Sequence, residues 1–220
     1  MDKQVIALKK RLKKEGKQGI ALDIDEVLAD TVFHLMENLI KRFGNPENLS
    51  ARELINKYQY TYYVPQFQTK EARDWTIEEI HRDDIQENLP LIENSNHWVN
   101  KVNKIVPICA YLTKRPVSVL PGTIKFLKKH GFPEAEIIAK PLDIELKDGN
   151  KLKAEILKYL YPEIRGLVDD DPKFAEFIHH KEYKGTLWLY GAGSYSGENK
   201  NVKPCKNWEQ VYASLLSAKK

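Results

Sequence analysis

Short apolar runs that end in polar residues recur along the chain, and amphipathic stretches separate them. Runs of this kind are typical of parallel strands whose two faces are both covered by helices. The chain contains five of them, at residues 19–25, 106–113, 136–140, 165–172 and 186–191. The last four alternate with helical stretches, which predicts an α/β fold with a parallel sheet and helices on both faces.

Apolar residues spaced three and four apart predict the helices between these strands. The first stripe consists of Val27, Leu28, Val32, Leu35, Met36, Leu39, Ile40 and Phe43. It stops at Gly44 and Pro46, which are typical of a helix end. Pro116 is expected to open the next helix, which ends near Gly131 and Pro133. Further helices are predicted over residues 152–160, 172–180 and 207–216.

The pattern changes between residues 45 and 104. Two stretches there have helical character, at residues 70–82 and 91–105, and no run has the pattern of a buried strand. We therefore expect a small helical insert at residues 45–104. It would follow the first strand–helix unit of a core formed by residues 1–44 and 105–220.

The composition is that of a folded protein with a well-solvated surface. Of the 220 residues, 42% are hydrophobic and 30% are charged, which is enough apolar material for one core and excludes global disorder. No apolar run is long enough for a membrane span, and the basic N-terminus lacks the apolar centre of a signal peptide. The two cysteines, Cys109 and Cys205, exclude a disulfide framework, so a reducing, cytoplasmic location is expected.

Positive charge is concentrated at the N-terminus. Residues 1–18 contain seven lysines and arginines against two acidic residues, whereas the whole chain has a net charge of +4. We expect a basic N-terminal helix on a nearly neutral protein. A solvated helix explains this segment better than a phosphate-binding or membrane-binding one, so nucleic acid is an unfavoured partner and no membrane partner is expected.

Acidic residues follow two of the predicted strands, where the ligand site of an open α/β sheet is found. Asp23 and Asp25 follow the first, and Asp169, Asp170 and Asp171 follow the fourth. Helix capping explains one aspartate at each place, such as Asp25 and Asp171, but leaves the other three without a structural role. Like charges a few ångströms apart repel by roughly 1 kcal/mol in water and several kcal/mol at a protein surface. A divalent cation removes this repulsion, and oxygen ligands favour Mg²⁺.

A hydroxyl group and two cations, those of Thr113, Lys114 and Arg115, follow the second strand. The helix expected to start at Pro116 would add an N-terminus that binds anions. These groups beside a cation indicate a phosphorylated ligand and phosphoryl transfer, in which positioning and charge neutralisation dominate catalysis. The alternative is an ordinary strand threonine beside two solvated cations.

The segments together resemble the four motifs of the haloacid dehalogenase superfamily of phosphohydrolases. They are DIDEVLADT (23–31), YLTKRP (111–116), NKLKAEIL (150–157) and LVDDDP (167–172). The resemblance covers residues 19–30 and 105–215, and implies a Rossmann-like core with the insert as a cap. The stretch after Pro116 and the closing KNWEQVYASLL are similar to nucleotidase-like members, including the 5′(3′)-deoxyribonucleotidases. Glu26 stands where many relatives have glycine.

The resemblance implies roles for the matched residues. Asp23 would be the nucleophile that forms an aspartyl-phosphate, and Asp25 the general acid and then the base. Asp23, the backbone carbonyl of Asp25, and Asp169 would hold Mg²⁺, with Asp170 in direct contact or linked through water. Thr113 would bind the phosphoryl oxygens. The presence of Asp25 argues against dehalogenase chemistry, which does not use this second acid.

Other residues complete the expected site. Lys114 would bind phosphate together with a lysine of the third motif, for which Lys153 and Lys151 are the main candidates. The cap would exclude water and select the substrate. Its Tyr60 and Tyr62 either stack on a nucleobase or form the core of the cap, which needs large side chains to hold together.

The sequence therefore predicts a Mg²⁺-dependent phosphatase that acts on a small phosphomonoester, with a nucleoside monophosphate as the favoured substrate. A sugar phosphate and the 3′-phosphate of a polynucleotide are alternatives within the same class. A non-catalytic binding protein on the same scaffold is the alternative from another class. The oligomeric state is not determined by the sequence.

Overall fold

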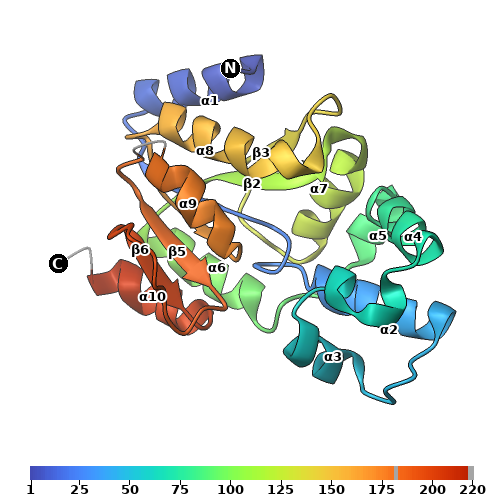
Figure 1. Cartoon of the computed structure of the whole chain (residues 1–220). Coiled ribbons are helices and arrows are strands. Elements are labelled where there is room, and N and C mark those ends of the chain that lie inside the picture. Colours follow the sequence, from blue (N-terminus) through green and yellow to red (C-terminus); the bar gives the residue numbers. More distant parts are fainter. Residues whose placement is uncertain (181–182, 218–220) are drawn as a thin grey trace.

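Within residues 1–180 and 183–217, which the computed structural model describes, six strands form one parallel sheet between two helical layers (Figure 1). The strands are β1 (Gly19–Leu22), β2 (Ile108–Pro116), β3 (Glu136–Lys140), β4 (Ile164–Asp169), β5 (Thr186–Tyr190) and β6 (Val202–Cys205). Their order in the sheet is β3-β2-β1-β4-β5-β6. The predicted α/β class with a parallel sheet is confirmed.

Strand side chains alternate between two apolar layers, so both faces of the sheet are covered by helices. One face carries α1 (Lys3–Lys14), α8 (Gly149–Leu160) and α9 (Pro172–His180). The other face carries α6 (Ser95–Ile105), α7 (Leu120–Lys129) and α10 (Trp208–Ser217). None of the helices in the described part of the chain is long and apolar enough to cross a membrane.

The basic N-terminal segment forms the predicted helix, and one side of α1 belongs to the core. Val5, Leu8 and Leu12 are buried in the apolar layer that α8 also contributes to. The Lys9 ammonium donates a 2.8 Å hydrogen bond to the carbonyl of Tyr161, just beyond the end of α8. The expectation of a solvated helix therefore holds only for its outer face.

The chain winds outward in two directions from the centre of the sheet, because β2 and β3 lie on one side of β1 and β4 to β6 lie on the other. Leu22 pairs with Val168 across the boundary, and the backbone N–H of Asp23 donates to the carbonyl of Val168 at 2.9 Å. Ligands bind at such a switch point in open α/β sheets. The register places Asp23 beside Asp169 at that point.

A helical insertion between β1 and β2 forms the cap, at the right of Figure 1. It contains α2 (Thr31–Phe43), α3 (Ala51–Tyr58), α4 (Lys70–Ile80), α5 (Asp83–Asn88) and the short 3₁₀ helices Thr61–Tyr63 and Pro65–Phe67, and it ends with α6. Met36 and Leu39 of α2 share an apolar cluster with Leu54 and Phe67, whereas α6 packs on the sheet. The predicted domain boundaries at residues 45 and 104 stay predictions.

Three local expectations differ from the structure. The first cap helix begins at Thr31 rather than near Val27, because Leu28 and Ala29 hydrogen-bond back to the carbonyl of Ile24 in a tight loop. Pro116 ends β2 and does not open a helix; the 3₁₀ turn Val117–Val119 follows before α7. A second such turn, Leu146–Asp148, precedes α8. Strand β6 was not predicted because its sequence, VKPC, has no apolar run.

The close approach of β1 to β2 requires glycine at residue 19. A Cβ atom there would lie 2.1 Å from the Pro107 carbonyl oxygen. We therefore expect Gly19→Ala to lower the free energy of unfolding by about 2 kcal/mol, as overpacked cores do, in urea denaturation. Gly193→Ala is the control, because its Cβ would meet only the flexible Lys206 side chain at 3.2 Å. Equal destabilisation of both variants would contradict this explanation.

Candidate active site at the carboxyl edge of the sheet

Three carboxylates gather where β1 and β4 end. Asp23, Asp169 and Asp170 each offer an oxygen atom, and these atoms all lie within 4.8 Å of one another. Asp23 and Asp169 are buried, at 2% and 1% exposure. Burial raises the pKa of Asp170 well above its usual value, and the neighbouring charges of Asp169 and Asp23 add to this. The predicted acidic cluster is therefore assembled, and its oxygen atoms and mutual repulsion fit a hard divalent cation such as Mg²⁺.

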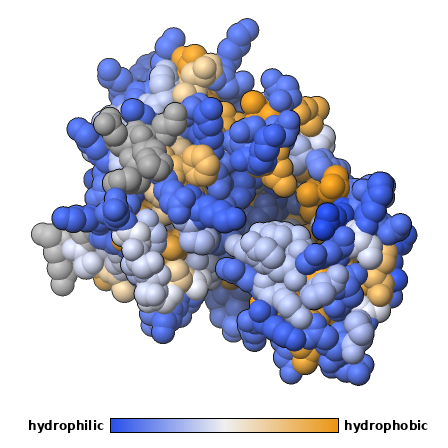
Figure 2. Space-filling model, in the orientation of Figure 1, coloured by the Kyte–Doolittle hydropathy of each residue, from blue (hydrophilic) through white to orange (hydrophobic). Residues whose placement is uncertain are grey.

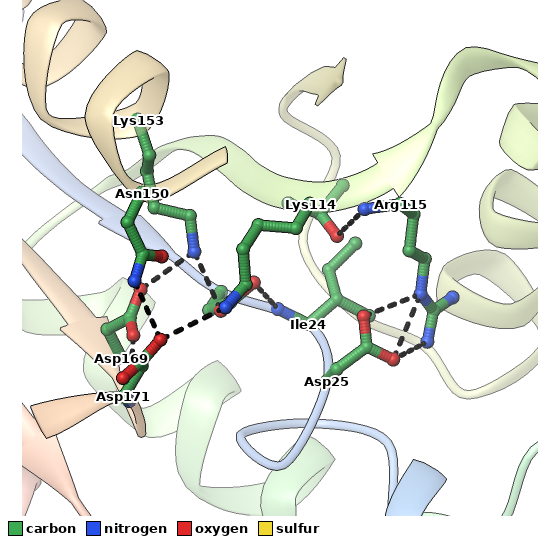
Figure 3. A network of polar contacts seen from close by, with 10 residues as sticks. Ile24, Asp25, Lys114, Arg115, Asn150, Lys153, Asp169 and Asp171 are labelled. Atoms are coloured by element: carbon green, nitrogen blue, oxygen red, sulfur yellow. Dashed lines mark hydrogen bonds and ion pairs between the residues drawn. The ribbon is translucent and has the colours of Figure 1, made fainter. Parts of the chain in front are cut away.

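Lys153 is the lysine that reaches this cluster. Its ammonium group lies 2.7 Å from Oδ2 of Asp23 and 2.7 Å from Oδ2 of Asp169 (Figure 3). Burial alone would lower the pKa of Lys153, but the two carboxylates raise it above its usual value, so the side chain stays charged. Lys151 is exposed on α8, because two residues along a helix correspond to about 200° of rotation.

Lys114 follows Thr113 at the end of β2 and faces the same cluster. Its ammonium group pairs with Asp171 at 3.1 Å, and Asn150 donates to the same carboxylate oxygen at 2.8 Å. Asp171 also accepts the backbone N–H of Lys173 in the first turn of α9, so the capping role considered for it is present. Thr113 is 6% exposed, and its hydroxyl accepts the backbone N–H of Arg115.

Arg115, which the sequence left either as a cation beside the ligand or as a solvated residue, is a buried residue of the site. It is 5% exposed, and its guanidinium group donates hydrogen bonds to the Asp25 carboxylate from Nη2 at 2.8 Å and from Nε at 3.0 Å (Figure 3). The Thr31 hydroxyl donates to the same carboxylate at 2.5 Å. Burial would raise the pKa of Asp25, but Arg115 and Thr31 lower it below its usual value. Asp25 caps no helix at Glu26, since α2 starts only at Thr31. A partly buried carboxylate needs a counter-charge, and this need could have identified Arg115 as a site residue.

Glu26 adopts a left-handed backbone conformation with φ of 56°. Glycine enters this region without a steric penalty, which explains why many members of the resembled superfamily have glycine here. The Glu26 carboxylate accepts the backbone N–H of Val32 at 2.7 Å in the first turn of α2. Burial raises the pKa of Glu26 to about 8.

The helix N-terminus expected at Pro116 is not an anion site. Helix α7 begins at Leu120, and the backbone N–H of Gly122 in its first turn is bonded to the Asp83 carboxylate of the cap at 2.6 Å. The prediction that this N-terminus receives phosphate is therefore wrong. The contact instead fixes cap helix α5 to core helix α7.

A cavity of about 810 Å³ separates the cap from this edge of the sheet, and we call it the main cavity. Asp23 and Asp25 line it from the core, and Tyr60, Tyr62 and Tyr63 line it from the cap. Figure 2 shows the recess between the two lobes. The rings of Tyr60 and Tyr62 are parallel, with centroids 5.3 Å apart. The apolar cluster of the cap is formed by other residues, among them Met36, Leu39, Leu54, Val64 and Phe67.

Comparisons with known proteins bear on the fold. No protein-family model matches the chain, and no curated protein matches its sequence. A haloacid dehalogenase superfamily hydrolase from Ehrlichia chaffeensis is similar in structure, with a TM-score of 0.52 and 14% identity over 93% of this chain and 99% of its own. The chain has the haloacid dehalogenase-like fold.

Two further structures with the haloacid dehalogenase-like fold agree. A candidate phosphatase from Clostridium difficile has a TM-score of 0.55 and 16% identity, over 90% of this chain and 99% of its own. A dehalogenase has a TM-score of 0.53 and 12% identity, over 91% of this chain and 97% of its own. Identities this low establish the fold, and the chemistry has to be argued from the side chains described above.

The Asp25–Arg115 ion pair gives a test of the site that needs no substrate. We expect Arg115→Ala to lower the free energy of unfolding by about 2 kcal/mol, because it leaves a partly buried carboxylate without its partner. Lys70→Ala removes an exposed ion pair with Asp74 and should change stability by less than about 0.5 kcal/mol. Urea denaturation measures both. Similar small losses would show that the Arg115 pair is as weak as a surface pair.

Proposed function

We propose that this protein is a Mg²⁺-dependent phosphatase that hydrolyses a small phosphomonoester through an aspartyl-phosphate on Asp23. The observation that carries the proposal is the convergence of Asp23, Asp169, Asp170 and Lys153 at one edge of the sheet, beneath a cavity closed by a cap. The structural neighbours named as a hydrolase and a candidate phosphatase support this reaction class. Another neighbour is named as a dehalogenase. We prefer phosphatase chemistry because Asp25 supplies an acid that dehalogenation does not use.

Asp23, Asp169 and Asp170 would hold the Mg²⁺ ion, together with the backbone carbonyl of Asp25. When bound, the ion supplies positive charge that offsets the carboxylates and the phosphoryl oxygens. Lys153 and Lys114 add two further cations on the same side. Charge neutralisation of this kind is the main contribution of a protein to phosphoryl transfer.

The reaction has two displacement steps. In the first, a carboxylate oxygen of Asp23 bonds to phosphorus, the ester P–O bond breaks, and Asp25 gives a proton to the departing alkoxide. In the second, water bonds to phosphorus and gives a proton to Asp25, while the bond from phosphorus to Asp23 breaks. Inorganic phosphate leaves, and both aspartates return to their starting state.

The pairing of Asp25 with Arg115 restricts when Asp25 can act. The guanidinium group holds Asp25 as a carboxylate, which is the form that accepts a proton from water. The first step needs the protonated form, so the carboxyl group has to turn away from Arg115 and take up a proton from solvent when substrate is present. It returns a proton to solvent when it pairs with Arg115 again after turnover. The leaving group of the substrate is the partner toward which it turns.

A nucleoside monophosphate is the substrate we propose. The ring of Tyr60 in the cavity wall supports it, because an aromatic face can stack on a nucleobase. A polynucleotide 3′-phosphate is less well supported, since the basic helix α1 lies away from the cap (Figure 1). A protein that only binds phosphorylated ligands would show no turnover at all.

The roles of Asp23 and the two lysines are tested with p-nitrophenyl phosphate. Asp23→Asn should lower kcat by about 10³-fold or more, because it removes the nucleophile. Lys153→Met should lower kcat by about 10²-fold through lost charge stabilisation. Lys151→Met, the matched control on the exposed face of α8, should stay within about twofold of the native protein. Full activity of a folded Asp23→Asn protein would refute the nucleophile assignment.

Metal dependence is tested by binding as well as by activity. EDTA should abolish hydrolysis and added Mg²⁺ should restore it. Mg²⁺ should also raise the Tm of the native protein, since a ligand that binds only the folded state stabilises it. Asp169→Asn should lose this Tm shift, whereas Asp74→Asn, an exposed carboxylate of the cap, should keep it. A Tm shift that survives in Asp169→Asn would place the ion elsewhere.

A further inference from the structure

A second cavity, of about 910 Å³, adjoins the main cavity. We call it the loop cavity, because residues 191–199, which follow β5, form much of its wall. Six residues line both cavities: Glu26, Gln59, Tyr60, Asp170, Pro172 and Lys173. The loop cavity therefore starts at the acidic cluster, on the shared wall formed by Tyr60, and is large enough for a small organic group.

Two tyrosines of the loop cavity are held in place by the protein itself. The hydroxyl of Tyr195 lies so close to Gly197 that a Cβ atom there would be 2.2 Å from its oxygen atom. The ring of Tyr190 packs against Trp208, with centroids 5.7 Å apart. Aromatic surfaces fixed in advance bind a flat ligand with a smaller loss of entropy.

Asn199 supplies a hydrogen-bond donor in the same wall. Its side chain is 6% exposed, and its Oδ1 accepts the backbone N–H of Asn201 at 3.0 Å, which orients the amide. Its Nδ2 has no hydrogen-bond partner among the described residues. A buried donor without an acceptor is unfavourable, and Asn199 belongs to the wall of the loop cavity, so a ligand acceptor is the partner we assign to this amide.

The two cavities differ in charge. The main cavity has as many cationic side chains as carboxylates. The cations are those of Lys114, Arg115, Lys140, Lys147 and Lys173, and the carboxylates are those of Asp23, Asp25, Glu26, Asp170 and Asp171. Lys173 is the one lysine or arginine among the described residues that line the loop cavity, and it faces an excess of carboxylates, those of Glu26, Asp170, Glu176 and Glu198. The main cavity therefore suits a phosphate group, whereas the loop cavity suits an uncharged one.

We infer that the loop cavity binds the uncharged part of the substrate, a ring system with a hydrogen-bond acceptor for Asn199, while the phosphate stays in the main cavity. This inference rests on the proposed phosphatase function. The nucleoside of a nucleoside monophosphate has this chemistry, with a flat base for Tyr195 and several acceptor atoms. An oligonucleotide does not, because its further phosphates would enter a cavity lined by one lysine and several carboxylates.

Kinetics with adenosine 5′-monophosphate and p-nitrophenyl phosphate test the assignment. The ratio of their KM values should rise about tenfold in Tyr195→Ala, the loss expected for one stacked base. It should rise about fivefold in Asn199→Asp, which keeps the oxygen that bonds Asn201 and loses the free donor. Tyr212→Ala, a partly buried tyrosine that packs against Trp98, should leave the ratio unchanged. An unchanged ratio in both loop-cavity variants would overturn the inference.

A substrate comparison tests the charge argument separately. We expect kcat/KM for adenosine 5′-monophosphate to exceed that for a 3′-phosphorylated trinucleotide by about tenfold or more. The opposite order would overturn the inference. Adenosine alone should also bind to the Asp23→Asn protein in calorimetry, and Tyr195→Ala in that background should weaken the binding. If p-nitrophenyl phosphate is not hydrolysed, the proposed function fails; if it is hydrolysed and adenosine does not bind, only the inference about the loop cavity fails.

Discussion

The ammonium group of Lys153 lies between two buried carboxylates that end neighbouring strands, and the site depends on this interaction. Without a cation, Asp23 and Asp169 would repel each other at the centre of the sheet. One lysine makes an ion pair with both, and Asp170 adds a third carboxyl group to the cluster. In the proposed function, one divalent ion would occupy this cluster and bind the phosphate group.

Two further ion pairs lie beside the cluster. Lys114 pairs with Asp171 and Arg115 pairs with Asp25, so each of the two cations near the end of β2 has an acidic partner that follows another strand. These pairs hold the side chains in position before any ligand arrives. In the proposed reaction, preorganised charge of this kind would lower the barrier to phosphoryl transfer.

The cap forms part of the wall of the main cavity. Helix α5 is fixed to α7 by Asp83, while the tyrosines that follow α3 project over the strand ends. Tyr60 lies at the junction of the main cavity and the loop cavity, and burial and the nearby charges of Asp170 and Asp171 raise the pKa of its hydroxyl. The cap therefore reaches the acidic cluster itself and divides the space above it into a cation-lined part and a cation-poor part.

The local sequence determined the α/β class, most of the strands and the identity of the acidic residues, because apolar runs and strand-end aspartates are local signals. Strand β6 and the start of α2 were not determined, since β6 has no apolar run and α2 is delayed by a backbone turn around Glu26. Only the tertiary structure distinguished Lys153 from Lys151, because helix rotation places one inside and the other in solvent. It also decided that Arg115 is buried against Asp25 and that a second cavity opens beside Tyr60. Those features depend on which segments meet across the sheet, and long-range contacts of that kind leave no periodic pattern in the chain.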